Sequence, residues 1–403
     1  MPQKLMILIA DGMGDYPLPE LGDKTPLQAA ATPFMDLAAS KGILGSCQTI
    51  PQGMTPGSDI ANMSLLGYDP ARYHTGRGPI EAAAQGLHPE PTDLIYRLNL
   101  CTVSSLSEQG RMLDHSGGHV QTDHALALLD QLTPLLDKKT LRIVPGFQYR
   151  HLLIQKDGAN AQEADLDLVP PHDILNQSLE GALSVYAQSP LLQDLLTKAH
   201  SLLEAPQSNP TQANTVWPWG QGRALQLPAF EQTFGLQGAI ISAVDLIKGL
   251  GRAAGMYVPD IPGATGLLDT DYEAKIQEAL GFLRTGDFVF VHLEGPDECG
   301  HAGDMQSKIE AIERFDARIV GPALQAAPDL DAALCIACDH LTPISVRTHT
   351  REPVPFVFMP GGNQKTARDT SFTEATAWKG TVHIQEGHSL LPHLLHLMQD
   401  QGR

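Results

Sequence analysis

The stretch Phe288-Val-Phe-Val-His-Leu-Glu-Gly-Pro-Asp-Glu-Cys-Gly-His301 joins a short apolar run to a cluster of polar side chains. Its first six residues, Phe288–Leu293, have the length and apolar character of a buried strand. Asp297 and His301 follow at a spacing of four residues, so in a helix both side chains lie on one face and can reach one cation. The stretch therefore predicts a strand whose carboxyl end leads into metal ligands.

Two other apolar runs of the chain also end at acidic residues. Leu5–Ala10 is followed by Asp11, and Leu334–Cys338 is followed by Asp339 and His340. In parallel α/β sheets the chemistry collects at the carboxyl ends of the strands. We therefore expect these side chains to share one edge of the sheet with the first pair.

Helical patterns alternate with the apolar runs in the outer parts of the chain. Tyr272–Leu283 and Lys308–Ile319 carry apolar residues near helical spacing, and Val354–Met359 is a fourth strand candidate. Alternating strands and helices predict an α/β core with a mostly parallel sheet.

The middle of the chain reads as a smaller α/β domain. His115–Pro134 and Pro190–Leu203 have helical patterns, and Leu141–Gln155 holds two strand-like pieces. At 403 residues the chain is long enough for a large core that carries an insertion. We expect a core of residues 1–87 and 213–403, with residues 88–212 as the inserted domain.

Composition restricts the partners and the compartment. Lys and Arg number 27 and Asp and Glu 46, which gives a net charge of −19 that repels nucleic acid and anionic lipid. Five cysteines are too few and too scattered for a disulfide framework, and the Cys335-Ile-Ala-Cys338 pair lies in an apolar run typical of a buried strand. No apolar segment has the length of a membrane span. We expect a soluble cytoplasmic protein without a signal peptide.

Six side chains at the predicted strand ends and nearby are of metal-ligand type: Asp11, Asp297, His301, Asp339, His340 and His349. Taken singly, each is typical of a surface pair, a capped loop or an exposed histidine. Three carboxylates and three imidazoles together suit Mn²⁺ or Zn²⁺ better than Ca²⁺. With a bridging nucleophile they are enough for two cations about 4 Å apart, which clamp the attacking and leaving oxygens in phosphoryl transfer.

The segment Met54-Thr-Pro-Gly-Ser-Asp-Ile-Ala-Asn62 reads as a loop that enters a helix. Ser58 stands at the helix start, where a capping serine is the ordinary interpretation. The functional interpretation is a nucleophile, because unpaired N–H groups there attract phosphate and a metal lowers the pKa of a bound hydroxyl. Asn62 is placed one turn later to donate to a phosphate oxygen, and Thr55 is the competing nucleophile.

An acidic chain that binds an anionic substrate needs a local group of cations. Arg77 is flanked by glycines that let backbone and guanidinium approach a ligand together, and arginine binds phosphate or carboxylate as a fork. Each candidate taken alone is typical of a surface charge. The other candidates are Arg97, Arg150, Arg223 and Lys248.

A series of motifs that runs in order through nearly the whole chain resembles the archaeal-type, cofactor-independent phosphoglycerate mutases of the alkaline phosphatase superfamily. The joint set is specific, although no single motif is. The motifs are Asp11-Gly-Met-Gly-Asp15, Pro56-Gly-Ser-Asp-Ile-Ala-Asn62, Leu66-Gly-Tyr-Asp-Pro70, Gly76-Arg-Gly-Pro-Ile-Glu-Ala82, Pro262-Gly-Ala-Thr-Gly266, Asp297-Glu-Cys-Gly-His301 and Asp339-His340.

The resemblance implies an alkaline-phosphatase-like core with an inserted smaller domain, and a phosphoserine at Ser58 during interconversion of 3- and 2-phosphoglycerate in glycolysis and gluconeogenesis. It implies that Lys248 neutralises phosphate charge. It implies two divalent cations, Mn²⁺ above all, with Mg²⁺, Zn²⁺ or Co²⁺ as alternatives. One cation would be held by Asp297, His301 and His349, and the other by Asp11, Ser58, Asp339 and His340.

The chain departs from that family pattern in the predicted insert. Many members carry an arginine in an Ala-Gly-Arg-Ile segment where this chain has Gly117-Gly-His-Val120. Histidine is shorter and mostly neutral, so His119 weakens one contact with the substrate carboxylate. A smaller departure is Asp339-His-Leu-Thr-Pro343, where many members have serine in place of leucine. Together with the segment Ala213–Gly222, His119 resembles a bacterial branch proposed to phosphorylate homoserine.

Four functions therefore stay open on the sequence. The leading hypothesis is a phosphoglycerate mutase acting on a small phosphorylated acid. The alternatives are a phosphotransferase acting on homoserine, a metal-dependent phosphatase, and a binding protein that kept the fold without the activity. The sequence predicts no oligomeric state.

Overall fold

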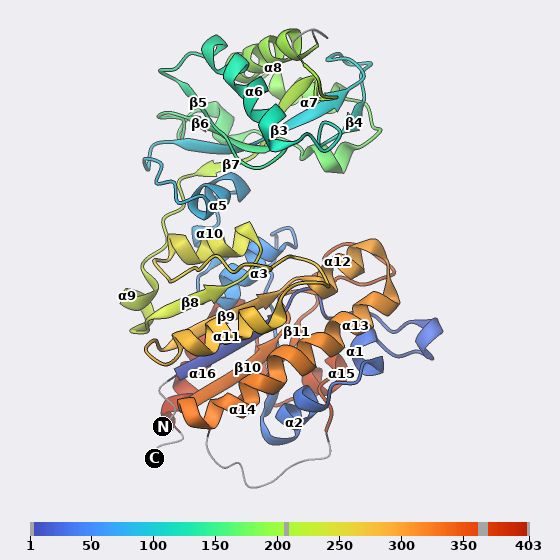
Figure 1. The fold of residues 1–403 in the computed structure, drawn as a ribbon, viewed down its shortest axis with the longest axis vertical. Helices are drawn as coiled ribbons and strands as arrows, with labels where there is room; N and C mark the ends of the chain where they lie inside the picture. The colour runs from blue at the N-terminus through green and yellow to red at the C-terminus, as the bar shows by residue number, and fades with distance from the viewer. Residues whose placement is uncertain (1–3, 205–208, 362–369, 401–403) are drawn as a thin grey trace. The chain divides into compact units, whose positions relative to one another are not determined.

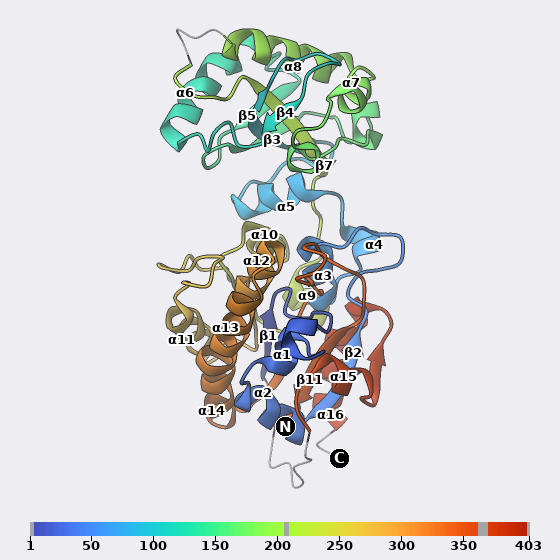
Figure 2. The same cartoon turned by 90° about the vertical axis from the view of Figure 1, so that its right-hand side faces the viewer.

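The computed structural model describes residues 4–204, 209–361 and 370–400. The chain forms two compact units (Figures 1 and 2). Unit 1 contains residues 1–74 and 227–403, and unit 2 contains residues 75–226. Among the described residues, no helix combines the length and the apolar character that crossing a bilayer requires.

Unit 1 is built on a seven-stranded sheet with a parallel centre. Strand β1 pairs in parallel with β9 on one side and with β10 on the other. The strand β11 runs antiparallel to β10, so this fourth predicted strand is confirmed but departs from the parallel pattern. Across the sheet the strands are β12 (Val382–Ile384), β2 (Ile43–Cys47), β11 (Val354–Met359), β10 (Ala332–Ala337), β1 (Lys4–Ala10), β9 (Phe288–Leu293) and β8 (Gly238–Ile241).

The central strands are continuous apolar runs because helices cover the sheet. Every residue of β9 and β10 is buried, and in β1 only Lys4 is partly exposed. Such runs are typical of strands buried on both faces. Cys335 and Cys338 are buried free thiols of this region, as expected for core residues.

The two helices predicted for the core are confirmed as α11 (Tyr272–Phe282) and α13 (Met305–Phe315). Helices α11, α13 and α14 lie side by side along one face of the sheet (Figures 1 and 2). A π-helical turn, Asp316–Val320, joins α13 to α14. The remaining helices of unit 1 are α1 (Pro26–Ala29), α2 (Pro33–Lys41), α3 (Ser58–Leu65), α4 (Pro70–Tyr73), α9 (Phe230–Phe234), α10 (Asp245–Ala253), α12 (Gly295–Ala302), α14 (Gly321–Leu330), α15 (Glu374–Trp378) and α16 (Leu390–Asp400).

Unit 2 is an antiparallel sheet with its own hydrophobic core. Strand β3 is central and pairs with three neighbours, β4, β6 and β7. Trp217 and Tyr186 are fully buried and pack edge to face in this core. The elements are α5 (Arg77–Ala84), β3 (Leu94–Val103), β4 (Met112–Asp114), α6 (Thr122–Leu132), β5 (Leu141–Val144), β6 (Arg150–Gln155), α7 (Glu180–Tyr186), α8 (Pro190–Leu203) and β7 (Thr215–Arg223).

The unit boundaries fall after His74 and Gln226, not at the expected 87/88 and 212/213. The difference has a physical cause in the sheet of unit 2. Strand β7 pairs with β3 along most of its length, and α5 packs on both strands. Residues 75–87 and 213–226 therefore belong with the inserted unit.

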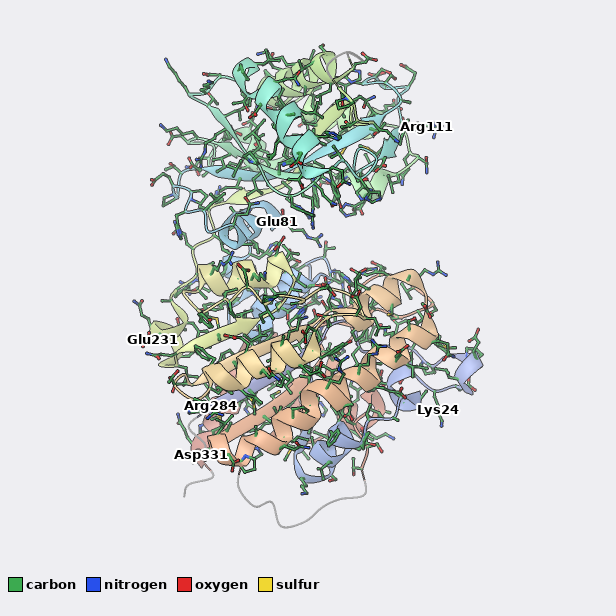
Figure 3. The ribbon with its side chains drawn as sticks, in the orientation of Figure 1. Lys24, Glu81, Arg111, Glu231, Arg284 and Asp331 are labelled. Carbon is green, nitrogen blue, oxygen red and sulfur yellow. The ribbon has the colours of Figure 1, made fainter. Side chains whose placement is uncertain are left out.

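Charged side chains lie over the surfaces of both units. Lys24, Glu231 and Arg284 of unit 1 and Arg111 of unit 2 are exposed and project outward (Figure 3). Charged side chains are ordinarily exposed in this way, so the buried carboxylates of unit 1, among them Asp11, Asp297 and Asp339, are exceptions that require partners.

Candidate metal centre

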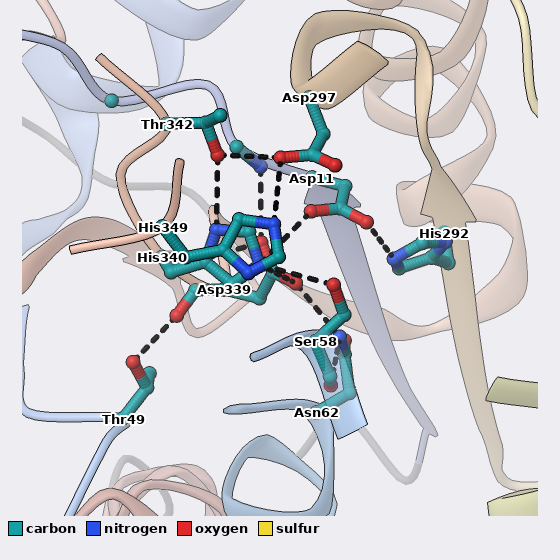
Figure 4. Close-up of polar contacts among 12 residues, drawn as sticks. Asp11, Thr49, Ser58, Asn62, His292, Asp297, Asp339, His340, Thr342 and His349 are labelled. Atoms are coloured by element: carbon teal, nitrogen blue, oxygen red, sulfur yellow. Dashed lines mark hydrogen bonds and ion pairs between the residues drawn. The ribbon is translucent and has the colours of Figure 1, made fainter. Parts of the chain in front are cut away.

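The order of the strands explains why distant residues meet at one edge of unit 1. Strands β10, β1 and β9 are neighbours and parallel, so their carboxyl ends lie together. Asp11 follows β1, Asp339 follows β10 after one residue, and Asp297 lies in α12 just beyond β9. Figure 4 shows the three carboxylates around the imidazoles of His340 and His349.

One group of donor atoms is centred on Asp297, in the first turn of α12. Its Oδ2 lies 3.3 Å from His301 Nε2, one turn later, and its Oδ1 lies 3.4 Å from His349 Nε2. The two histidines are 2.9 Å apart at their Nε2 atoms. The predicted i,i+4 pair therefore meets His349 as expected, and His301 Nδ1 is held by the carbonyl of Arg347 at 3.0 Å.

A second group of donor atoms consists of Asp11, Asp339 and His340. His340 Nε2 lies 3.5 Å from Asp11 Oδ1 and 3.4 Å from Asp339 Oδ2. Within this group the three donor atoms all lie within 4.8 Å of one another. The same holds within a set formed by Asp297, His340 and His349. His340 also stacks on His349 with 3.9 Å between ring centroids, so the two groups share a boundary.

Ser58 is the first residue of α3, and Gly57 is the N-cap. The Ser58 hydroxyl lies 3.0 Å from His340 Nε2, which directs it toward the second donor group. The structure thus gives Ser58 a contact that a capping serine does not make.

Asn62 lies one turn later in α3. Its amide group donates to the carbonyl of Ser58 and to Asp339 Oδ2, both at 2.8 Å. In this structure both amide hydrogens are used to hold neighbouring groups. The expected donation from Asn62 to a phosphate oxygen therefore differs from the contacts observed.

The pKa values of two carboxylates of the site are shifted in opposite directions. Burial, with the nearby carboxylates of Asp339 and Asp297, raises the pKa of Asp11 well above its usual range. Burial also acts to raise the pKa of Asp297, but hydrogen bonds with His301 and His349 outweigh it and hold that pKa well below its usual range. The Asp297 contact raises the pKa of His301 to about 9. A cation at this edge would relieve the repulsion among the three carboxylates.

Two buried oxygens of the site lack hydrogen-bond partners among the described residues, Asp11 Oδ1 and Asn62 Oδ1. A buried carboxylate oxygen without a partner is costly unless it binds a cation. Oxygen and imidazole donors at these spacings are those that transition metals prefer. The residues present therefore fit divalent cations.

Gly12 explains why the loop after β1 can approach the ligands so closely. Its φ is +62°, and a Cβ atom there would lie 2.6 Å from Asp297 Oδ1 and from Thr342 Oγ1. A side chain at this position would displace the ligand carboxylate. The glycine-rich motif that begins at Asp11 is thus a condition for the geometry of the site.

Three polar residues of the site were not predicted to act there. His292 is fully buried in β9 and its Nε2 lies 3.1 Å from Asp11 Oδ2. Thr342 contacts both Asp297 and His340. Burial among Glu298 and Asp297 raises the pKa of Glu294 to about 8. The sequence could have indicated His292, because a histidine inside an apolar strand is unusual. The roles of Thr342 and Glu294 depend on tertiary contacts that the sequence does not show.

Unit 2 holds a group of cations around Arg97. The Arg97 guanidinium lies 4.3 Å from the Trp219 ring and 2.9 Å from Glu81 Oε1. Burial lowers the pKa of Arg97, and the charges of Arg77 and Arg150 lower it further. Its Nε has no hydrogen-bond partner among the described residues. Three of the predicted arginines therefore lie within electrostatic reach of one another.

Histidines and aromatic rings extend this arginine group. His172 contacts Trp219 at 5.2 Å between centroids and His115 at 6.1 Å. Desolvation and the charges of Arg97 and Arg77 act to lower the pKa of His172, against the opposing effect of Asp173. We call Arg77, Arg97 and Arg150 the cationic cluster, and the rings of His115 and His172, whose pKa values are lowered, lie beside it.

The remaining predicted residues have different neighbours. His119 is exposed, in a left-handed backbone conformation with φ of +53°, and its ring lies 6.5 Å from that of Tyr149. Arg223 Nε donates to the carbonyl of Ala159 at 2.8 Å. In unit 1, Lys248 is paired with Asp260 at 3.1 Å, on helix α10, which packs against α3.

Comparison with known proteins gives consistent matches over nearly the whole chain. Residues 3–393 match the metalloenzyme superfamily. The chain is 43% identical over 397 residues to 2,3-bisphosphoglycerate-independent phosphoglycerate mutase from Methanosarcina barkeri, covering 96% of this chain and 98% of the relative. It is 39% identical to a probable enzyme of the same name from Geobacter sulfurreducens, covering 97% and 99%.

Solved structures agree with the sequence relatives. A protein from Pyrococcus horikoshii is similar with a TM-score of 0.80 and 30% identity, covering 99% of this chain and 98% of that one. The cofactor-independent phosphoglycerate mutase from Thermoplasma acidophilum is similar with a TM-score of 0.63 and 26% identity, covering 98% and 99%. The predicted fold class and resemblance are thereby confirmed.

Proposed function

The chain belongs to the metalloenzyme superfamily, within the 2,3-bisphosphoglycerate-independent phosphoglycerate mutases, and on that premise we propose that it interconverts 3- and 2-phosphoglycerate through a phosphoserine at Ser58. The activity is an isomerisation by intramolecular phosphoryl transfer. Support comes from the relatives' shared name and from the Ser58 hydroxyl, which contacts His340 of the second donor group.

The observation that carries this proposal is the position of the Ser58 hydroxyl. It lies 3.0 Å from His340 Nε2, within the donor group of Asp11 and Asp339. The start of α3 adds backbone N–H groups that favour an anionic phosphoryl group. A serine so placed is suited to accept phosphate and to return it.

The proposed reaction has two balanced steps. Ser58 Oγ forms a bond to phosphorus as the bond between phosphorus and O3 of 3-phosphoglycerate breaks, and the serine proton ends on O3. Glycerate then reorients, its O2 takes the phosphoryl group, and the proton of O2 returns to Ser58. Exclusion of water during reorientation separates a mutase from a phosphatase.

We propose two divalent cations at the site, with Mn²⁺ as the preferred metal. Asp297, His301 and His349 would hold one, and Asp11, Ser58, Asp339 and His340 the other. When bound, the cations supply positive charge that lowers the pKa of Ser58 and offsets the phosphoryl charge. Asn62 would orient Ser58 and Asp339, to which its amide donates, and Lys248 would neutralise phosphate.

The cationic cluster of unit 2 is the proposed binding group for the anionic ends of the substrate. Arg97 is largely buried at 12% exposure, and although Glu81 pairs with its Nη2, its Nε–H has no partner among the described residues and can donate to an anion. The Trp219 ring lies 4.3 Å from the Arg97 guanidinium and the Tyr149 ring 5.8 Å from that of Arg150, which adds cation–π attraction. Arg223 and His119 are proposed as outer contacts of this group.

His119 is the specific observation in favour of a second acceptor. It occupies the position where many family members carry arginine, and its exposed imidazole gives a weaker grip on a carboxylate. Transfer of phosphate to homoserine is therefore the second candidate function.

The test uses chelator-treated protein reloaded with Mn²⁺ and supplied with 3-phosphoglycerate. We expect 2-phosphoglycerate from the wild type, at least about a thousandfold less from Ser58→Ala, and near-normal turnover from Thr55→Ala, the matched control. Labelled phosphate should be trapped on the wild type and not on Ser58→Ala. Failure to form 2-phosphoglycerate, with phosphohomoserine formed from a phosphate donor, would instead support the second candidate.

A further inference from the structure

Thr342 lies between the two donor groups of unit 1. It is fully buried, and its hydroxyl lies 2.5 Å from Asp297 Oδ1 and 3.2 Å from His340 Nδ1 (Figure 4). Asp297 belongs to the first donor group. His340 belongs to the second, with Asp11 and Asp339, and its donor atom also lies within reach of Asp297 and His349. One side chain therefore contacts ligands of both proposed cation sites.

Only one arrangement of donors and acceptors allows the Thr342 hydroxyl to form both hydrogen bonds. An ionised carboxylate accepts hydrogen bonds and donates none. The single hydroxyl proton of Thr342 must therefore point to Asp297 Oδ1, which leaves its oxygen lone pairs for His340. The Nδ1 atom of His340 must then carry a hydrogen and donate it.

This direction determines which tautomer His340 adopts. With the hydrogen on Nδ1, the lone pair is on Nε2, which faces Ser58, Asp11 and Asp339. A lone pair in that position is what a metal requires of histidine. The Asp339 carboxylate, with Oδ2 3.4 Å from Nε2, favours the opposite tautomer when no cation is bound, so Thr342 works against it.

The surroundings of Thr342 hold it in one orientation. Its carbonyl accepts from the buried Lys308 ammonium at 2.8 Å, and its amide donates to the carbonyl of Gly14 at 3.2 Å. A Cβ on Gly300 of α12 would lie 2.5 Å from the Thr342 carbonyl oxygen and 2.8 Å from its Cγ2. Contacts with Lys308, Gly14 and Gly300, from three segments, thus leave the side chain little freedom.

We propose that Thr342 is a positioning residue that couples the two cation sites, by selecting the His340 tautomer for one and orienting the Asp297 carboxylate for the other. The inference rests on the two-cation site of the proposed function. It predicts that the cations bind with linked affinities, because filling either site favours the same direction of the hydrogen-bond chain.

The test is calorimetric titration of Mn²⁺ into chelator-treated protein, for the wild type and three variants. Thr342→Val removes the hydroxyl at equal size, Thr342→Ala removes it with less bulk, and Thr342→Ser keeps it. We expect two linked binding events in the wild type and in the serine variant. In the valine and alanine variants we expect affinity to fall about tenfold or more, with the linkage lost.

A second readout is independent of activity. The visible absorption of bound Co²⁺ reports ligand geometry, and should change in the valine and alanine variants and be restored in the serine variant. Thermal unfolding of the metal-free proteins identifies any variant that fails to fold, and the alanine variant then carries the comparison alone.

Wild-type affinities and Co²⁺ spectra in the hydroxyl-free variants would overturn the proposal, as would a wild type that binds fewer than two cations. The proposed activity fails separately: a wild type that shows Thr342-dependent binding but forms no 2-phosphoglycerate leaves this inference standing and removes the mutase assignment.

Discussion

His151 of unit 2 is a buried histidine whose two nitrogens have different environments. Nδ1 accepts from the amide of Gly146 at 3.0 Å, and Nε2 has no hydrogen-bond partner among the described residues. Burial lowers the pKa of His151 to about 4, against a value of 6.5 in an exposed histidine. The folded state therefore holds this ring neutral at pH values where the unfolded chain already binds a proton.

The sign of the resulting pH dependence follows from that difference. The stability that His151 contributes is complete above pH 6.5 and is lost as pH falls toward 4, because only the unfolded state gains the proton. We expect a loss of about 2 kcal/mol by pH 5. His151→Asn, which keeps an acceptor for Gly146, should reduce the slope of the unfolding free energy between pH 7 and pH 5. An unchanged slope in urea titrations would contradict the assignment.

Arg97 gives a second prediction at the scale of one residue. Arg97→Lys keeps the charge but loses the planar stacking on Trp219 and the fork geometry. We expect KM for 3-phosphoglycerate to rise about tenfold or more, as for the loss of a charge-assisted hydrogen bond. Arg142→Lys, at an exposed position of β5 outside the cluster, is the matched control and should change KM little. Steady-state assays with both variants decide the matter, and equal effects would argue against the cationic cluster as the substrate-binding group.

At the scale of elements, a buried lysine joins three parts of unit 1. Lys308 of α13 donates to the carbonyl of Gly14, to Asp15 Oδ2 and to the carbonyl of Thr342, at 3.2, 2.8 and 2.8 Å. Asp15 in turn accepts from the amide of Ile344. All three ammonium hydrogens are used, so the loops after β1 and β10 are fixed to α13 and to each other.

Breaking this junction should cost far more than breaking a surface ion pair. Lys308→Met leaves Asp15 buried without its counter-charge, and we expect the free energy of unfolding to fall by about 3–5 kcal/mol. Lys198→Met removes an exposed i,i+4 partner of Asp194 and should cost less than about 0.5 kcal/mol. Denaturant unfolding compares the two directly. A Lys308 variant as stable as the Lys198 variant would show that the junction adds nothing.

Elements also mark where prediction from sequence succeeds and where it ends. The apolar runs that became β1, β9 and β10 were readable, and so were the acidic residues at their ends. Strand β3 and its partner β7 were not predicted. Strand β7 contains Pro218, a residue that usually argues against a strand, yet Pro218 is paired with Leu98 of β3. Burial of β3 in unit 2 depends on long-range pairing that local patterns do not encode.

The same limit applies to the candidate site. The type of each ligand was readable, because a carboxylate or imidazole after a buried strand is unusual. The positions of Thr342 and Lys308 were not, since they depend on how α12, α13 and two loops pack. Arg223 was readable as a cation but not as one that bonds to the Ala159 carbonyl. The metal-ligand side chains at the strand ends were therefore predictable from the sequence. The residues that hold those side chains in place were not.

At the scale of the whole molecule, the candidate metal ligands all belong to unit 1, while the cationic cluster belongs to unit 2. Each unit has its own sheet and its own core. A ligand stabilises only the state that binds it. Binding of cations alone should therefore stabilise unit 1 and leave the stability of unit 2 unchanged.

Hydrogen exchange measures this division directly. Mn²⁺ at about 100 times its dissociation constant should slow openings that release the cation about a hundredfold. We expect added protection in the loops after β1 and β10, at the start of α3 and in α12, because their side chains form the donor groups. Strands β3 and β6 should exchange at the same rate with and without Mn²⁺. Asp297→Asn, which removes one ligand charge, should lose much of the protection in α12, and equal protection in both units would show that cations also bind unit 2.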